Sequence, residues 1–144
     1  MENIVIDKVL RKNCAIYREI YSCDQLPHVI VCPSVFVVNT DPARKPGRHW
    51  ICRFFVEHGY GEFFYSFGTR SQRVFERYMN SRCIAWTFNK KQMQSLVSRF
   101  CGHYCIWYCM MKFRKVTLHE LVRVMSRDTG LNDFIVHRFA CRLI

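Results

Sequence analysis

Apolar residues recur at different spacings along the first third of the chain, and these spacings predict its first elements. Between residues 5 and 22 they are loosely spaced as on one face of a helix, with an interruption at Asn13: Ile6, Val9, Leu10, Ile16 and Ile20. Residues 29–38 are rich in β-branched side chains and broken by Pro33, which favours a strand. A turn is expected at residues 39–42, Asn-Thr-Asp-Pro, followed by an exposed basic loop at residues 43–48.

The middle of the chain predicts strands around one short helix. Strands are expected at residues 49–57 and 62–67, joined by a turn at residues 58–61. The phenylalanines of these strands alternate only partly, which indicates burial on both faces: Phe54, Phe55, Phe63, Phe64 and Phe67. A helix is expected at 71–79, with Ser71 as a candidate cap, and a strand at 82–89.

The last third is predominantly helical in pattern. A polar loop at 90–99 precedes a very apolar segment at 101–112, which is long enough for a buried helix. Thr117 is a candidate cap before Glu120, and further helices are expected up to residue 125 and at 131–142. Helices before and after a small central mixed sheet predict a single α+β domain over residues 1–144.

Composition narrows the class of protein. No run of eighteen apolar residues is present, and the acidic start at residues 1–7 does not resemble a secretory signal, so we expect an intracellular protein without a membrane span. An odd number of cysteines, nine, does not suggest a disulfide framework.

The charge of the chain points to a polyanionic partner. Lys and Arg number 22 against 11 Asp and Glu, a net charge of +11, which favours contact with nucleic acid. The densest basic cluster, Lys112, Arg114 and Lys115, is the first candidate for DNA contact. The competing interpretation is a basic surface that aids solubility, with this cluster as a solvated helix end.

Three residues are candidates for thiol catalysis. Cys101 would open the apolar helix, where the macrodipole favours a thiolate and lowers the pKa of the thiol. His49 would open a strand after a Pro-Gly loop and is the candidate base, with Trp50 available to pack over its ring. Gln94, seven residues before Cys101, is the candidate oxyanion donor. A lone Cys or His in an apolar context is more often structural, so each assignment is weak by itself.

A metal site is not expected. Cys101, Cys105 and Cys109 recur at helical spacing with His103 among them, but this spacing is more typical of one packed helix face than of paired zinc ligands. His103 is expected to be structural or near the active site, and not to be the base.

The sequence resembles the adenovirus-type cysteine endopeptidases (adenain) and their relatives in virus-like DNA transposons. The resemblance rests on residues 24–27, 37–42, 46–50 and 62–68, on Gln94 to Cys105, and on residues 131–139. It implies an α+β fold shared distantly with the SUMO-specific proteases. Cys101 would be the nucleophile and His49 its base, with Gln94 and the Cys101 N–H holding the oxyanion.

The same resemblance implies partners for the protein. Substrates would be viral capsid or core precursor proteins, cleaved by a monomer in the host nucleus and the virion, with DNA and an activating peptide as stimulating cofactors. Cys83 resembles the position that forms a disulfide with such a peptide, although a buried strand cysteine is the simpler interpretation.

One position departs from the family's pattern. Where the family has the triad carboxylate, this sequence has Tyr65. Glu62 is an unsuitable substitute, because three residues along a strand turn its side chain to the opposite face. Three alternatives remain: a Cys101–His49 dyad, a copy that folds but cuts poorly, and a carboxylate supplied from elsewhere.

Two other functions compete with the endopeptidase. The first is a catalytically impaired relative that serves as a basic DNA-binding or virion structural protein. The second is an activity on host conjugates like that of the SUMO proteases.

Overall fold

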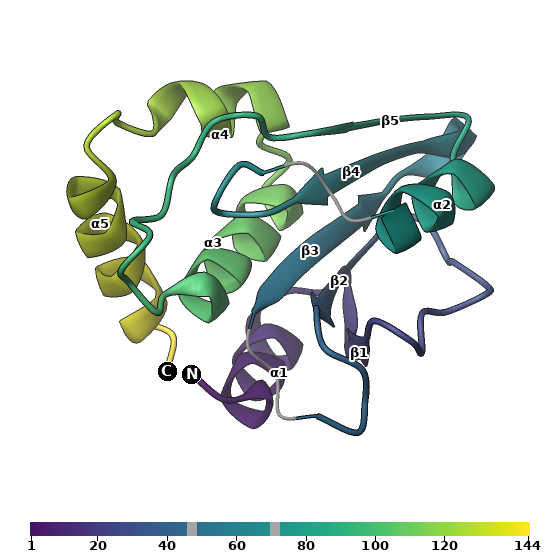
Figure 1. Cartoon of the computed structure of the whole chain (residues 1–144), viewed down its shortest axis with the longest axis horizontal. Helices are drawn as coiled ribbons and strands as arrows, with labels where there is room; N and C mark the ends of the chain where they lie inside the picture. The colour runs from purple at the N-terminus through teal and green to yellow at the C-terminus, as the bar shows by residue number, and fades with distance from the viewer. Residues whose placement is uncertain (46–48, 70–72) are drawn as a thin grey trace.

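A five-stranded mixed sheet forms the centre of the molecule, with its strands in sequence order (Figure 1). The computed structural model describes residues 1–45, 49–69 and 73–144. The outer pairs of strands, β1–β2 and β4–β5, run parallel, and the pairs β2–β3 and β3–β4 are antiparallel. The strands are β1 (Tyr17–Ser22), β2 (Ser34–Asn39), β3 (Trp50–Phe55), β4 (Tyr60–Phe64) and β5 (Ala85–Phe88).

Helices cover both faces of this sheet. Against one face pack α1 (Asn3–Asn13) and α3 (Cys101–Phe113), with α5 (Thr129–Cys141) lying on α3. The helix α2 (Arg73–Arg82) contributes Phe75 and Met79 to the core on the other face. The short helix α4 (Leu118–Val124) and the 3-10 turn η1 (Glu57–Gly59) complete the elements. The predicted single α+β domain with a mixed sheet is confirmed.

The central strands are buried on both faces, as the phenylalanine pattern predicted. In β3, Phe54 packs into the core beneath α1 and α3, while its neighbour Phe55 packs into the core beneath α2. In β4, Phe64 packs into the first of these cores and Phe63 into the second. This two-sided burial fixes the register of the sheet, because a slip of one residue would exchange the two sets of rings.

Most predicted elements are present, and capping explains where one of them begins. The predicted capping box at α4 is present: the Glu120 N–H donates to Thr117 Oγ1 at 3.2 Å, and the Thr117 N–H donates to Glu120 Oε2 at 3.2 Å. The predicted turn after β2 is held by the Asp41 N–H, which donates to Asn39 Oδ1 at 2.9 Å. The proposed cap at Ser71 lies outside the described residues.

The prediction of one helix over residues 5–22 is wrong in its second half. The helix α1 ends at Asn13, whose side-chain Nδ2 donates to the Val9 carbonyl at 2.8 Å. Ile20 belongs to β1, which pairs with β2, and Ile16 leads into that strand. Both isoleucines pack against the core, so tertiary pairing, rather than helical spacing, determines their conformation.

The predicted contact of Lys112 with DNA is also wrong. Lys112 is 7% exposed, and its Nζ lies 2.9 Å from Glu62 Oε2, which is itself only 2% exposed. The ammonium also donates to the Val116 carbonyl at 3.0 Å and lies 4.6 Å from the centre of the Phe54 ring. A cation satisfied inside the protein in this way cannot reach a phosphate.

Among the helices described, none is long and apolar enough to cross a bilayer.

Candidate active site

Cys101 is the first residue of the buried helix α3. Its side chain is only 3% exposed, and it lies where the helix macrodipole favours negative charge. Gly102 beside it packs closely against α1: a Cβ at this position would lie 2.9 Å from Ile6 Cδ1, so that side chain would have to shift. The group that approaches Gly102 most closely is therefore Ile6 of this chain's own first helix.

His49 lies immediately before β3, opposite Cys101. Its Nδ1 is 3.5 Å from Cys101 Sγ, across 52 residues of sequence. The backbone holds the residue in place, since the His49 carbonyl accepts from the Thr40 N–H at 3.0 Å. The predicted pairing of Cys101 with His49 is therefore present in the structure.

Two aromatic rings contact the His49 imidazole. The ring centres of Tyr65 and Phe67 lie 6.5 Å and 5.8 Å from it, both edge-on. Trp50, which was expected to pack over the imidazole, instead donates its indole N–H to Asn3 Oδ1 at 2.5 Å. The walls of the site thus come from the turn after β4.

Gln94 is fully buried beside Cys101, in the loop before α3. Its Oε1 accepts from Ser66 Oγ at 2.6 Å, and its Nε2 donates to the Ser98 carbonyl at 3.1 Å. The Ser66 carbonyl in turn accepts from the backbone N–H groups of Met93 and Gln94 at 2.9 and 3.0 Å. The amide is therefore fixed in orientation, and its Nε2 also donates to Ser98 Oγ at 3.1 Å.

Buried polar residues of α5 anchor this loop from the other side. Asp133, 6% exposed, accepts from the Ser95 N–H at 3.3 Å, and the Tyr104 hydroxyl lies 2.9 Å from its Oδ1. Asn132 donates from Nδ2 to the Met93 carbonyl at 3.1 Å. The segment 131–139 that carried part of the resemblance thus serves to position the loop that holds Gln94.

Tyr65 stands where a carboxylate was expected. Asn89, 1% exposed, holds its backbone by two hydrogen bonds, from the Tyr65 N–H at 2.9 Å and to the Tyr65 carbonyl at 2.6 Å. Across the described residues, no carboxylate forms a hydrogen bond or an ion pair with the His49 ring. Glu62 is directed into the core, towards Tyr108 and Lys112, as its strand position predicted.

Burial dominates the acidity of the Cys101 thiol. It raises the pKa of Cys101 to about 11, with a further increase from Cys105, while hydrogen bonds from the Gln94 and Ser66 side chains and the Trp50 backbone oppose the rise. The expected lowering of this pKa is therefore not found in the resting protein. Burial and the nearby Cys101 also raise the pKa of Tyr65, so its hydroxyl is protonated at neutral pH.

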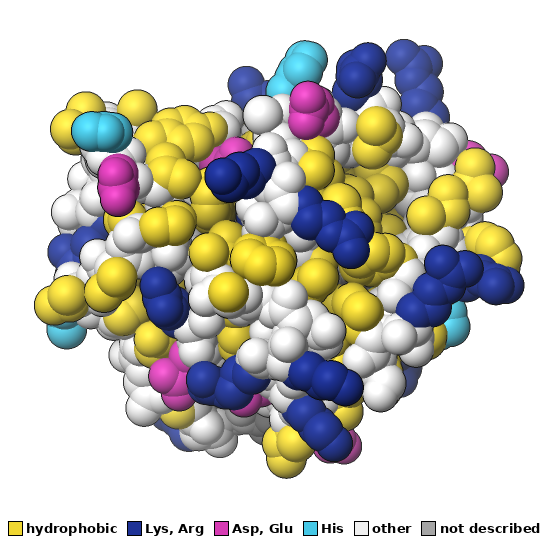
Figure 2. Space-filling model, turned by 180° about the vertical axis from the view of Figure 1, so that it is seen from behind, with side chains coloured by type: hydrophobic (Ala, Val, Ile, Leu, Met, Phe, Trp, Pro, Cys, Tyr) yellow, Lys and Arg dark blue, Asp and Glu magenta, His cyan; other side chains and the backbone are white. Residues whose placement is uncertain are grey.

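The remaining candidates lie away from this site. Cys83 follows α2 and is half-buried, and its Sγ would lie 2.6 Å from a Cβ placed at Gly61. Arg114 and Lys115 are exposed just beyond the far end of α3, about 20 Å from Cys101 at 1.5 Å per helical residue. On the face shown in Figure 2, the Lys and Arg side chains are scattered among apolar and neutral ones.

Three contributors to the site were not identified from the sequence. They are Ser66, Asn89 and Asp133, and each acts through a hydrogen bond to a loop distant in sequence. Ser66 and Asp133 fall within segments that carried the resemblance, which was the one available signal. Asn89 had none.

Comparison with solved structures decides the fold. The crystal structure of the ASFV pS273R protease superposes with a TM-score of 0.68 at 17% identity, over 94% of this chain and 66% of that one. The fold is that of this protease. Its selenomethionine form gives a TM-score of 0.62 at 17% identity, over 95% of this chain and 66% of that chain. The chain thus spans about two thirds of the length of that protease.

A bacterial protein shares the fold more loosely. The central domain of the Lpg1148 protein from Legionella pneumophila gives a TM-score of 0.54 at 11% identity, over 100% of this chain and 98% of that one. The sequence matches no protein-family model and no curated protein. The likeness to the protease fold is therefore structural, and the chemistry of this chain has to be argued from its own residues.

Proposed function

We propose that this protein is a cysteine endopeptidase in which Cys101 and His49 act as a dyad. The observation that carries the proposal is the 3.5 Å separation of Cys101 Sγ and His49 Nδ1 at the N-terminus of a buried helix. A nucleophile and a base at this distance meet the geometric requirement for covalent catalysis. The shared fold with the ASFV pS273R protease supports the same chemistry.

The mechanism follows from the positions of the protons. At neutral pH Cys101 is a thiol, so its proton passes to His49 Nδ1 as the sulfur attacks the substrate carbonyl. The oxyanion would accept hydrogen bonds from the Cys101 N–H, one of the donors that a helix start leaves unpaired, and from Gln94 Nε2, which would exchange its contact with Ser98 Oγ for the oxyanion. His49 then protonates the departing amine, and a water activated by His49 releases the acyl group.

The substrates we propose are viral or virus-like precursor proteins, cleaved in the host nucleus and in the virion. The resemblance to adenain supports this choice, together with the fold shared with a viral protease. Contact with DNA is a further part of the proposal, supported by the net charge of +11 and by the exposed Arg114 and Lys115. An activating peptide bound through Cys83 rests on the resemblance alone.

Peptide cleavage by the purified protein tests the proposal. We expect cleavage of a peptide library by the native chain, no cleavage by Cys101→Ala or His49→Ala, and normal cleavage by Cys23→Ser, a matched cysteine control far from the site in sequence. A peptidyl vinyl sulfone should label Cys101 and leave Cys23 unmodified. Cleavage that survives in Cys101→Ala would show that another group performs the chemistry.

The alternative function, a catalytically impaired relative kept as a DNA-binding or virion protein, is favoured by Tyr65. Its phenol is protonated and cannot stabilise an imidazolium as a carboxylate does. The discriminating result is cleavage by Tyr65→Asp with none by the native chain, in the presence of DNA and in its absence.

A further inference from the structure

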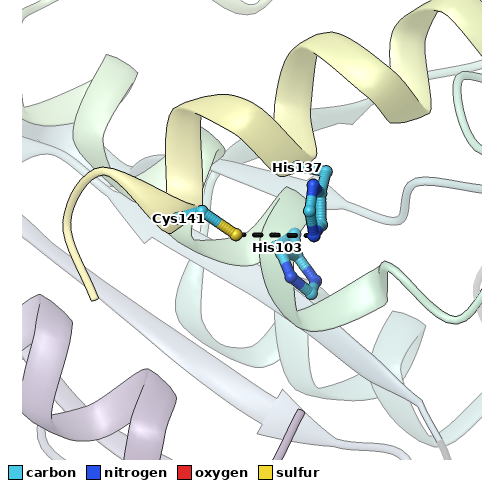
Figure 3. Close-up of side chains that lie close together, drawn as sticks. All are labelled: His103, His137 and Cys141. Carbon is cyan, nitrogen blue, oxygen red and sulfur yellow. Dashed lines mark hydrogen bonds between the residues drawn. The ribbon is translucent and has the colours of Figure 1, made fainter.

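Three side chains of the types that ligate metal ions lie together where the start of α3 meets the end of α5 (Figure 3). They are His103, in the first turn of α3, and His137 and Cys141, four residues apart on α5. Their candidate ligand atoms all lie within 4.8 Å of one another. Cys141 Sγ is 3.4 Å from His137 Nε2, which shows that the two side chains of α5 already converge.

One ring nitrogen of His103 has no hydrogen-bond partner among the described residues. The residue is only 9% exposed, and its Nδ1 forms no hydrogen bond with any of the described residues. A buried polar atom without a partner is destabilising, so an ion bound to this nitrogen would offset that cost.

The surroundings of these three side chains suit an ion-binding site that is walled on one side and open to solvent on the other. The Phe100 ring packs on both imidazoles, with ring centres 4.9 Å from His103 and 4.9 Å from His137, and forms an apolar wall. The two imidazoles lie 5.0 Å apart. Cys141 is exposed, so an ion could enter from solvent and keep a water as its fourth ligand.

We infer that His103, His137 and Cys141 form a binding site for a zinc ion. Two imidazole nitrogens and one thiolate are a donor set that zinc accepts in tetrahedral geometry, with bond lengths of about 2.0–2.3 Å. Those bond lengths place tetrahedral ligand atoms roughly 3.5 Å apart, so the side chains would close by about 1 Å. Binding would release the Cys141 proton to solvent, because only the thiolate coordinates zinc.

The inferred site is distinct from the proposed catalytic dyad and does not depend on it. Neither Cys101 nor His49 is among the three ligands. An ion here would link the turn of α3 that carries Cys101 to α5, which anchors the Gln94 loop through Asp133. We therefore expect zinc to stabilise the folded protein in proportion to its binding.

Calorimetric titration with zinc chloride tests the inference in fully reduced protein that carries Cys101→Ala. This background removes the competing thiol of the catalytic dyad. We expect one zinc ion per chain, at least tenfold weaker binding in Cys141→Ser and His137→Gln, and unchanged binding in the matched controls Cys23→Ser and His119→Gln. Both ligand substitutions are at solvent-accessible positions, and thermal unfolding without metal checks that each variant folds.

Cobalt provides an independent readout of the ligands. Cobalt added to the same background should give a thiolate-to-metal charge-transfer band that is lost in Cys141→Ser and kept in Cys23→Ser. Zinc binding of unchanged strength in Cys141→Ser and His137→Gln would overturn the inference. So would binding seen in the native chain and absent from the Cys101→Ala background, since that result would place the ion on the catalytic pair.

Discussion

Replacing Lys112 by Met should destabilise the fold strongly, because it leaves a buried carboxylate without its counter-ion. Met preserves most of the length and volume of the lysine stem and removes the ammonium. Glu62, 2% exposed, then loses contacts of 2.9 and 3.2 Å and keeps the Tyr108 hydroxyl at 2.9 Å. The substitution therefore isolates the electrostatic contribution from the packing of the side chain.

The expected cost follows from the geometry. Two unit charges 2.9 Å apart attract by about 6 kcal/mol at an effective dielectric constant of 20, before desolvation is subtracted. Breaking a buried pair by removing one partner typically costs about 3–5 kcal/mol. Because Tyr108 still donates to the carboxylate, we expect the lower end, about 3 kcal/mol of unfolding free energy.

Urea denaturation measures this cost, with Glu62→Gln/Lys112→Met as the companion variant. We expect the double variant to recover much of the loss, since a neutral amide needs no counter-ion. A single-variant cost below about 1 kcal/mol would refute the buried ion pair as described. DNA affinity should be the same for Lys112→Met and the native chain, because Lys112 does not reach the surface.

Three further predictions concern the site and the basic end of α3. Tyr65→Asp should raise kcat/KM about five-fold, because a half-exposed carboxylate–imidazolium pair is worth about 1 kcal/mol; initial rates on a cleaved peptide measure this. Gln94→Ala should lower kcat by about 10²–10³-fold if its amide holds the oxyanion, measured in the same assay beside thermal unfolding. Arg114→Ala and Lys115→Ala should each reduce the slope of log affinity for duplex DNA against log salt by about 0.9, measured by fluorescence anisotropy.

Matched variants make these predictions decisive. Tyr65→Phe removes only the hydroxyl, so an equal rise in that variant would contradict a role for the introduced charge. Ser98→Ala removes one neighbour of Gln94 and leaves its amide, so a loss as large as that of Gln94→Ala would mean that loop order, and not the oxyanion donor, limits the rate. A salt slope that is unchanged in both α3 variants would exclude this end of α3 from DNA contact.

Much of the fold could be predicted from the sequence because its signals are local. The length and apolarity of residues 101–112 predict a buried helix, and the Thr117–Glu120 pair predicts a helix start, since both patterns act within a few residues. Ile16 and Ile20 show the limit of such reasoning. Their spacing fits a helix, but pairing of β1 with β2 places them in and beside a strand.

The candidate site likewise contains residues that the sequence identified and residues that it misassigned or missed. Cys101, His49 and Gln94 were selected by residue type and order, and the structure brings them together. Lys112 was misassigned because a cluster of basic residues carries no information about burial, and its partner Glu62 lies 50 residues away. The proximity of His137 and Cys141 to His103 was missed for the same reason, since His103 is on another helix.

The acidity of Cys101 shows how competing effects at one atom are decided by their size. The position at a helix N-terminus predicts a lower pKa, and a macrodipole is worth about 0.3–1 kcal/mol. Burial acts in the opposite direction, and a net rise of the pKa from 9.0 to about 11 corresponds to about 2.7 kcal/mol against the thiolate. Burial therefore prevails in the resting protein. A thiolate can form only with proton transfer to His49 or with a change in solvation when substrate binds, so alkylation of Cys101 by iodoacetamide at pH 6 should be slower than that of the exposed Cys141.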